Sequence, residues 1–154
     1  MTLLAAFDVE GTPVPQGSMK HVGNGRIVPS NALALKRWRR AVAAAAAEDY
    51  TDEPYDGPVV LDCVFRLERP RSRRKAGPLV SVTPDCDKLV RAIGDAITGV
   101  IITNDSRIVQ QRGTKVYADA YIPTGQPGAY VIVRALDDRS TGELVDQLPH
   151  LRAA

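Results

Sequence analysis

The sequence predicts one small domain of the α/β or α+β class, in which a mixed sheet of about four strands packs against two main helices. Three observations lead to this prediction. A chain of 154 residues has room for a single hydrophobic core. Segments with strand periodicity are interleaved with two segments of helical periodicity. No repeat or linker divides the chain, so we assign residues 1–136 to one domain and leave residues 137–154 as a C-terminal tail of unassigned order.

The N-terminal part of the chain is predicted to form a strand, a loop and a helix. Residues 2–9 are the first strand, and the glycines and prolines of residues 11–29 predict a loop or loose hairpin. Residues 32–49 are rich in alanine and predict a helix, which Ser30 or Asn31 can cap. Its apolar face is expected to contain Leu35, Trp38, Val42 and Ala45.

The rest of the domain supplies a second helix and three more strands. Residues 68–82 are basic and contain prolines, which predicts a mobile surface loop. Residues 85–98 have helical periodicity, and Gly99 fits the position that ends a helix. The remaining strands are expected at residues 58–67, 106–117 and 129–136.

The positive charge of the chain is concentrated in two segments, although the net charge is only +2. No acidic residue occurs between Glu10 and Glu48, or between Glu68 and Asp85. Segregated charge favours a polyanionic partner, although solvated lysines and arginines are the alternative. The side chains expected to contact phosphates are Lys20, Lys36, Arg37, Arg40, Arg71, Arg73, Arg74 and Lys75.

The composition argues against several other classes of protein. Cys63 and Cys86 are the only cysteines and form no metal-binding pair, which makes a zinc site unlikely on spacing grounds. We interpret both as reduced thiols. The chain shows no secretory signal and no apolar stretch long enough to span a bilayer, so we expect a cytoplasmic protein without a membrane partner.

Three aspartates are the candidate metal ligands. Asp85 and Asp87 lie at the start of the second predicted helix, and the apolar residues 100–102 are expected to return Asp105 beside them. Aspartates at a helix start also stabilise the helix without any metal, and that is the alternative. Ligation by carboxylate oxygens alone suits Mg²⁺ or Mn²⁺.

Two basic side chains accompany these carboxylates. A bound metal would activate water and neutralise charge on a phosphate, and Arg91 or Lys88 could stabilise the same charge. The alternative for Arg91 is an ordinary pair within the helix with Asp87 and Asp95, and for Lys88 it is a solvated side chain.

The order of these residues resembles that of a known family. The pattern consists of residues 84–91 (Pro-Asp-Cys-Asp-Lys-Leu-Val-Arg), 95–100 (Asp-Ala-Ile-Thr-Gly-Val) and 104–108 (Asn-Asp-Ser-Arg-Ile). It resembles the RusA family of Holliday-junction resolvases, which is common in phages and prophages. Residues 13–18 (Pro-Val-Pro-Gln-Gly-Ser) and 69–72 (Arg-Pro-Arg-Ser) also look like the family.

The resemblance implies a homodimeric endodeoxyribonuclease that nicks four-way DNA junctions in paired strands, in recombination, repair or phage DNA processing. It also implies dependence on Mg²⁺ or Mn²⁺. The chain departs from the family pattern at Lys88, which replaces asparagine, at Arg91, which replaces lysine, and at Asn104, which replaces aspartate. The metal ligands implied by the resemblance are Asp85, Asp87 and Asp105.

Two other readings of the sequence stay open. A junction- or duplex-binding protein that does not cleave DNA would share the basic segments but would not need the three aspartates. Residues 7–12 (Phe-Asp-Val-Glu-Gly-Thr) resemble the start of haloacid-dehalogenase-type phosphatases, with Asp8 as the nucleophile. In that pattern Glu10 replaces the second aspartate, and a short motif without its structural context is weak.

Overall fold

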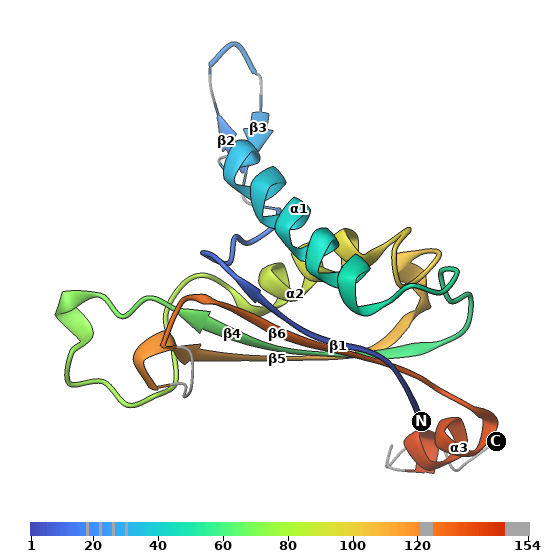
Figure 1. Ribbon diagram of the computed structural model, residues 1–154. Helices are drawn as coiled ribbons and strands as arrows, with labels where there is room; N and C mark the ends of the chain where they lie inside the picture. The colour runs from blue at the N-terminus through green and yellow to red at the C-terminus, as the bar shows by residue number, and fades with distance from the viewer. Residues whose placement is uncertain (18, 22, 26, 30, 121–124, 147–154) are drawn as a thin grey trace.

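The computed structural model describes residues 1–17, 19–21, 23–25, 27–29, 31–120 and 125–146. These residues form a four-stranded mixed sheet in the order β1-β6-β4-β5 (Figure 1). The pairs β1–β6 and β6–β4 are antiparallel, and β4–β5 is parallel. The predicted mixed class is therefore confirmed. The four strands are β1 (Thr2–Glu10), β6 (Gly128–Ala135), β4 (Val59–Leu67) and β5 (Ile108–Tyr117).

Two helices pack on one face of this sheet, and a small hairpin extends beyond them (Figure 1). Helix α1 (Ala32–Asp49) lies over β1, and α2 (Cys86–Ile97) lies over β4 and β5. Strands β2 (Met19–His21) and β3 (Ile27–Pro29) form the hairpin within the predicted loop. Strand β4 is almost continuously buried, because the helices cover one of its faces and neighbouring strands flank both of its edges.

Helix α2 approaches the edge strand β5 closely, and this contact positions the start of the helix. Its Leu89 and Ile93 are fully buried. A Cβ atom at Gly113 would lie 2.7 Å from Cγ2 of Val90, so the absence of a side chain on β5 is what lets the helix settle there. Gly99 has φ +79°, a left-handed conformation that ends the helix at little cost.

An ion pair between a buried arginine and an exposed aspartate ties β4 to β1 across the strand between them. Arg66 is fully buried, and its Nη2 donates to Oδ2 of Asp8 at 2.9 Å while its Nε donates to the carbonyl of Gln126 at 3.0 Å. The side chain crosses β6 at Gly128, where any Cβ would overlap the Arg66 guanidinium and the carbonyl of Val9. Asp8 thus has a structural partner, and the sheet order is not that of the phosphatases considered above.

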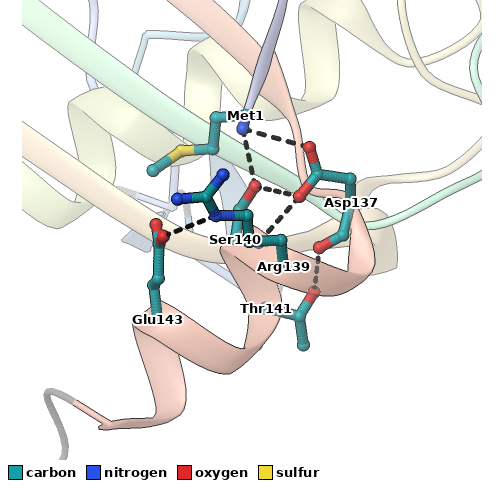
Figure 2. A network of polar contacts seen from close by, with 6 residues as sticks. All are labelled: Met1, Asp137, Arg139, Ser140, Thr141 and Glu143. Carbon is teal, nitrogen blue, oxygen red and sulfur yellow. Dashed lines mark hydrogen bonds and ion pairs between the residues drawn. The ribbon is translucent and has the colours of Figure 1, made fainter.

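The segment without assigned order contains a helix, α3 (Asp138–Asp146). Figure 2 shows the polar contacts at its start: Asp137 accepts hydrogen bonds from the backbone N–H of Ser140 at 2.7 Å and from its hydroxyl. The Met1 ammonium donates to Ser140 Oγ at 2.6 Å. These contacts hold the pKa of Asp137 low, at about 2, chiefly through the Ser140 hydroxyl. Residues 147–154 lie outside the described part.

One strand begins later than predicted. Asp105–Arg107 form a 3₁₀ turn, η2, so that strand β5 begins only at Ile108. Two other 3₁₀ turns, η1 (Arg71–Arg73) and η3 (Ala118–Ala120), lie in surface connections. In the described part of the chain, none of the helices combines the length and the hydropathy that a bilayer span requires.

Candidate functional site

A cleft of about 460 Å³ runs along the exposed side of α2. Asp87, Arg91 and Asp95 line it at successive turns of the helix, as their spacing of four residues requires. Its opposite wall is made by Asp105, from η2, and by residues 108–111 at the start of β5. The parallel pairing of β5 with β4 thus brings Asp105 beside the helix.

Asp85 belongs to a neighbouring pocket rather than to this cleft. It lies at the N-cap of α2, and its Oδ2 is 2.8 Å from Nζ of Lys88, one turn further along. This hydrogen bond lowers the pKa of the Asp85 carboxyl and raises that of Lys88. Both side chains line a pocket with Pro13 and Pro15. The ammonium of Lys88 therefore occupies one side of the Asp85 carboxylate.

The structure brings together two of the three predicted metal ligands. Asp87 and Asp105 line one cleft with Arg91, while Asp85 is engaged by Lys88. Among the described residues, no three Asp, Glu, His or Cys side chains lie close enough to hold a metal ion. Asp87 and Asp95 are about 12 Å apart along the helix axis, too far to share one ion directly.

Arg91 and Asn104, two departures from the family pattern, have defined surroundings. Arg91 is exposed in the cleft and makes no ion pair with another described residue, so the alternative of an ordinary pair with Asp87 and Asp95 is not seen. Asn104 accepts a hydrogen bond from the backbone N–H of Ser106 at 2.9 Å. It thereby stabilises the turn that carries Asp105.

Two side chains make contacts that support the site and that were not found from the sequence. One of them, Arg39, was expected to contact phosphates together with the other cations of its helix. Lys115 Nζ donates to the carbonyl of Val82 at 2.6 Å and to that of Pro84 at 2.7 Å, and so it fixes the segment that leads into α2. Arg39, on α1, pairs with Asp95 at 3.7 Å. No local pattern could have identified these partners, because each contact joins segments far apart in the chain.

The predicted phosphate contacts form two exposed groups. On α1 the exposed side chains are those of Lys36, Arg37 and Arg40. We name residues 68–82 the basic loop, and its exposed cationic side chains are those of Arg71, Arg73, Arg74 and Lys75. The composition predicted a mobile loop there, but the segment contains η1 and its own backbone hydrogen bonds, Arg73 N to Pro70 O at 2.8 Å among them. Lys20 lies in β2, and its side chain is outside the described residues.

Comparison with known proteins places these features in a family. The model of the family described as "Endodeoxyribonuclease RusA" matches residues 9–124, about three quarters of the chain. The matched range includes α2, the cleft and the basic loop. The chain belongs to the RusA family of endodeoxyribonucleases. A relative, "Uncharacterized protein YqaN" of Bacillus subtilis (strain 168), is 27% identical over 139 residues, which cover 83% of this chain and 94% of that protein.

RusA membership gives the cleft and the basic surfaces a common context. The family consists of nucleases that resolve Holliday junctions, and branched DNA is the partner that membership implies. The match begins at Val9 and therefore excludes Asp8, whose partner is Arg66. The segment from residue 68 to residue 107, which joins β4 to β5, holds both the basic loop and the candidate carboxylates.

Proposed function

We propose that this RusA-family protein is a Mg²⁺- or Mn²⁺-dependent endonuclease that resolves four-way DNA junctions by hydrolysing phosphodiesters in paired strands. One observation carries the proposal. The family match spans the whole connection between β4 and β5, and that connection supplies Asp87, Arg91 and Asp105 to one cleft. Acidic ligands beside a cationic side chain are suited to phosphoryl chemistry.

The side chains present fit a hard divalent cation in the type of donor. Asp87 and Asp105 offer carboxylate oxygens, the ligands that Mg²⁺ and Mn²⁺ prefer, from opposite walls of the cleft. Asp85 would be a third ligand only if its carboxylate left Lys88 and moved toward the cleft, because no three described carboxylates lie close enough together as the side chains stand. When bound, such an ion lowers the pKa of a coordinated water and neutralises charge on the phosphoryl oxygens.

The chain's own cations would bind and orient the substrate around that cleft. Arg91 is the cationic side chain of the cleft, and its guanidinium suits a phosphate because two of its N–H groups can bind together. It keeps its proton near neutral pH, so we assign it to charge stabilisation and not to proton transfer. The α1 group and the basic loop would hold backbone phosphates without reading sequence.

The proposal includes a homodimer. A four-way junction can adopt two-fold symmetry, and a two-fold symmetric dimer presents two equivalent clefts to two equivalent strands. Paired nicks require this arrangement, because one cleft can act on one strand at a time.

The Lys88–Asp85 pair favours one alternative, a protein that binds junctions without cleaving them. An ammonium already held by Asp85 competes with a metal for the same oxygens. The two candidates share every basic surface and differ only in what the carboxylates do.

Cleavage of a synthetic four-way junction and of linear duplex, in Mg²⁺, Mn²⁺ and chelator, tests the proposal. Metal-dependent paired nicks confined to the junction are the expected result. Tight junction binding without nicks in either metal would instead support the binding protein. Equal cutting of duplex and junction would contradict the proposed selectivity.

A further inference from the structure

Arg69 differs from the other cations of its segment in where its charge is directed. Its side chain is only 14% exposed, whereas Arg71, Arg73, Arg74 and Lys75 are all exposed and make no ion pair with another described residue. The Nε of Arg69 donates to Oδ2 of Asp119 at 2.7 Å, and this bond lowers the pKa of the Asp119 carboxyl. Arg69 is therefore turned into the protein.

The guanidinium of Arg69 lies inside the turn that the basic loop makes. Its Nη1 lies within hydrogen-bonding distance of three backbone carbonyls, those of Arg73 at 3.2 Å, Ala76 at 2.8 Å and Gly77 at 3.3 Å. Its Cζ lies 4.0 Å from the centre of the Tyr117 ring, a cation–π contact. One side chain thus binds carbonyls from both halves of the loop. It also contacts Tyr117 of β5 and Asp119 of η3, and so it fixes the loop against these two elements.

The far end of the loop is anchored beside the same ring. Tyr117 N donates to the carbonyl of Pro78 at 2.8 Å, and Val80 N donates to that of Lys115 at 3.1 Å. Leu67, Val80 and Tyr117 form a small separate hydrophobic cluster beneath the loop. Arg69 thus holds the first part of the loop, and the backbone bonds to Lys115 and Tyr117 hold its far end. The four exposed cations therefore project from a segment whose backbone is fixed at both ends.

We propose that Arg69 is a positioning residue that shapes the basic loop into a preformed phosphate-binding surface, and that it does not itself contact DNA. The inference rests on the proposed function for its ligand, DNA phosphates. A loop that is already ordered does not lose its conformational entropy when DNA binds, so the preformed shape contributes to affinity. Lysine cannot replace Arg69, because a single ammonium cannot reach carbonyls, carboxylate and ring together.

Trypsin cleavage of the free protein tests, without DNA, whether Arg69 holds the basic loop in this shape. Arg69→Gln should speed cleavage at the basic loop on the order of tenfold, because the open loop becomes more populated. Asp119→Asn should act in the same direction and more weakly, since it leaves the carbonyl contacts in place. The control is Arg112→Gln, which removes an arginine of β5 from its surface ion pair with Asp62 of β4. Unchanged cleavage at the basic loop in both test variants would overturn the proposal.

Binding of a four-way junction at several salt concentrations tests the role. Arg69→Gln should weaken binding on the order of tenfold at every salt concentration, with the slope against log salt unchanged. Arg73→Gln should lower the slope by about 0.9, the signature of one lost phosphate contact. The saturated single-turnover rate should not change in Arg69→Gln, because Arg69 is outside the cleft.

The two assays separate failure of the inference from failure of the proposed function. A slope in Arg69→Gln that falls as it does in Arg73→Gln would make Arg69 a direct contact and overturn the proposal. A wild-type protein that binds no junction would refute the proposed function, and the trypsin result would still decide whether Arg69 frames the loop.

Discussion

Asp87 is one of the two candidate metal ligands that line the cleft, Asp105 being the other. Asp87→Asn keeps the shape of the side chain and removes its charge. We expect junction cleavage to fall at least about 100-fold, while junction binding stays equal or tightens because a charge that repels DNA is gone. Gel assays of nicking and of binding measure the two effects. Glu48→Gln, an equal change of charge on exposed α1, is the control, and wild-type cleavage by Asp87→Asn would remove this residue from the mechanism.

Lys88 is one of the three departures from the family pattern, and it contacts a candidate metal ligand, Asp85. Lys88→Asn frees Asp85 from its partner at 2.8 Å. We expect Mn²⁺ to bind roughly twofold to fivefold more tightly, since exposed ion pairs of this kind contribute modestly. Calorimetry without DNA measures this affinity, and Lys36→Asn on α1 is the matched control. An unchanged affinity would mean that Lys88 does not compete with the metal.

At the scale of elements, the sequence predicted those whose signal is local. The helix expected at residues 32–49 is observed as Ala32–Asp49, because apolar side chains recur every turn and Tyr50 is extended. Residues 11–29 were predicted as a loop or loose hairpin, and the β2–β3 hairpin lies there, whereas α3 was not assigned. Helix α3 depends on contacts between Asp137, Ser140 and the distant Met1, and no window of sequence contains all three.

The low pKa of Asp137, at the start of α3, predicts how the stability of the fold depends on pH. Asp137 has a pKa of about 2, below its ordinary value of 3.8, and the Ser140 hydroxyl is the main cause. A lowered pKa stabilises the fold above the ordinary value, and this contribution is lost as pH falls from about 4 through about 2. Ser140→Ala should raise the pKa of Asp137 toward 3.8 in an NMR titration. Thr141→Val should not, because Thr141 binds the Asp137 backbone carbonyl.

At the scale of the whole molecule, the structure shows where the candidate site residues lie. Asp87 and Asp105 line one cleft, because the connection between the parallel strands β4 and β5 returns to the side of α2. Sequence reasoning could not predict that Lys88 would engage Asp85, since a flexible side chain has several partners within reach. The contacts of Lys115 and Arg39 could not be predicted either, because they depend on how separate elements pack.

The distribution of exposed cations makes a prediction about the whole DNA-binding surface. If the three exposed cations of α1 and the four of the basic loop all contact phosphates, they should together contribute a slope of roughly −6 per chain to the fall of log affinity against log salt. The double variant Lys36→Gln, Arg37→Gln should reduce that slope by about 2. Fluorescence anisotropy with cleavage-inactive protein measures it. Binding that does not change with salt concentration would contradict the proposal that these side chains contact DNA phosphates.

The connection between β4 and β5 also bears on how the molecule folds. These two strands pair directly, yet about forty residues separate the end of one from the start of the other. Closing so long a loop costs entropy before any strand contact repays it, so parallel pairing of this kind forms slowly. The β1–β6 pair closes a still longer loop, because more than one hundred residues separate Glu10 from Gly128. Both pairings are therefore expected to form slowly. Because the cleft needs β5 in place, a nascent chain would remain unable to cut DNA until that strand has docked.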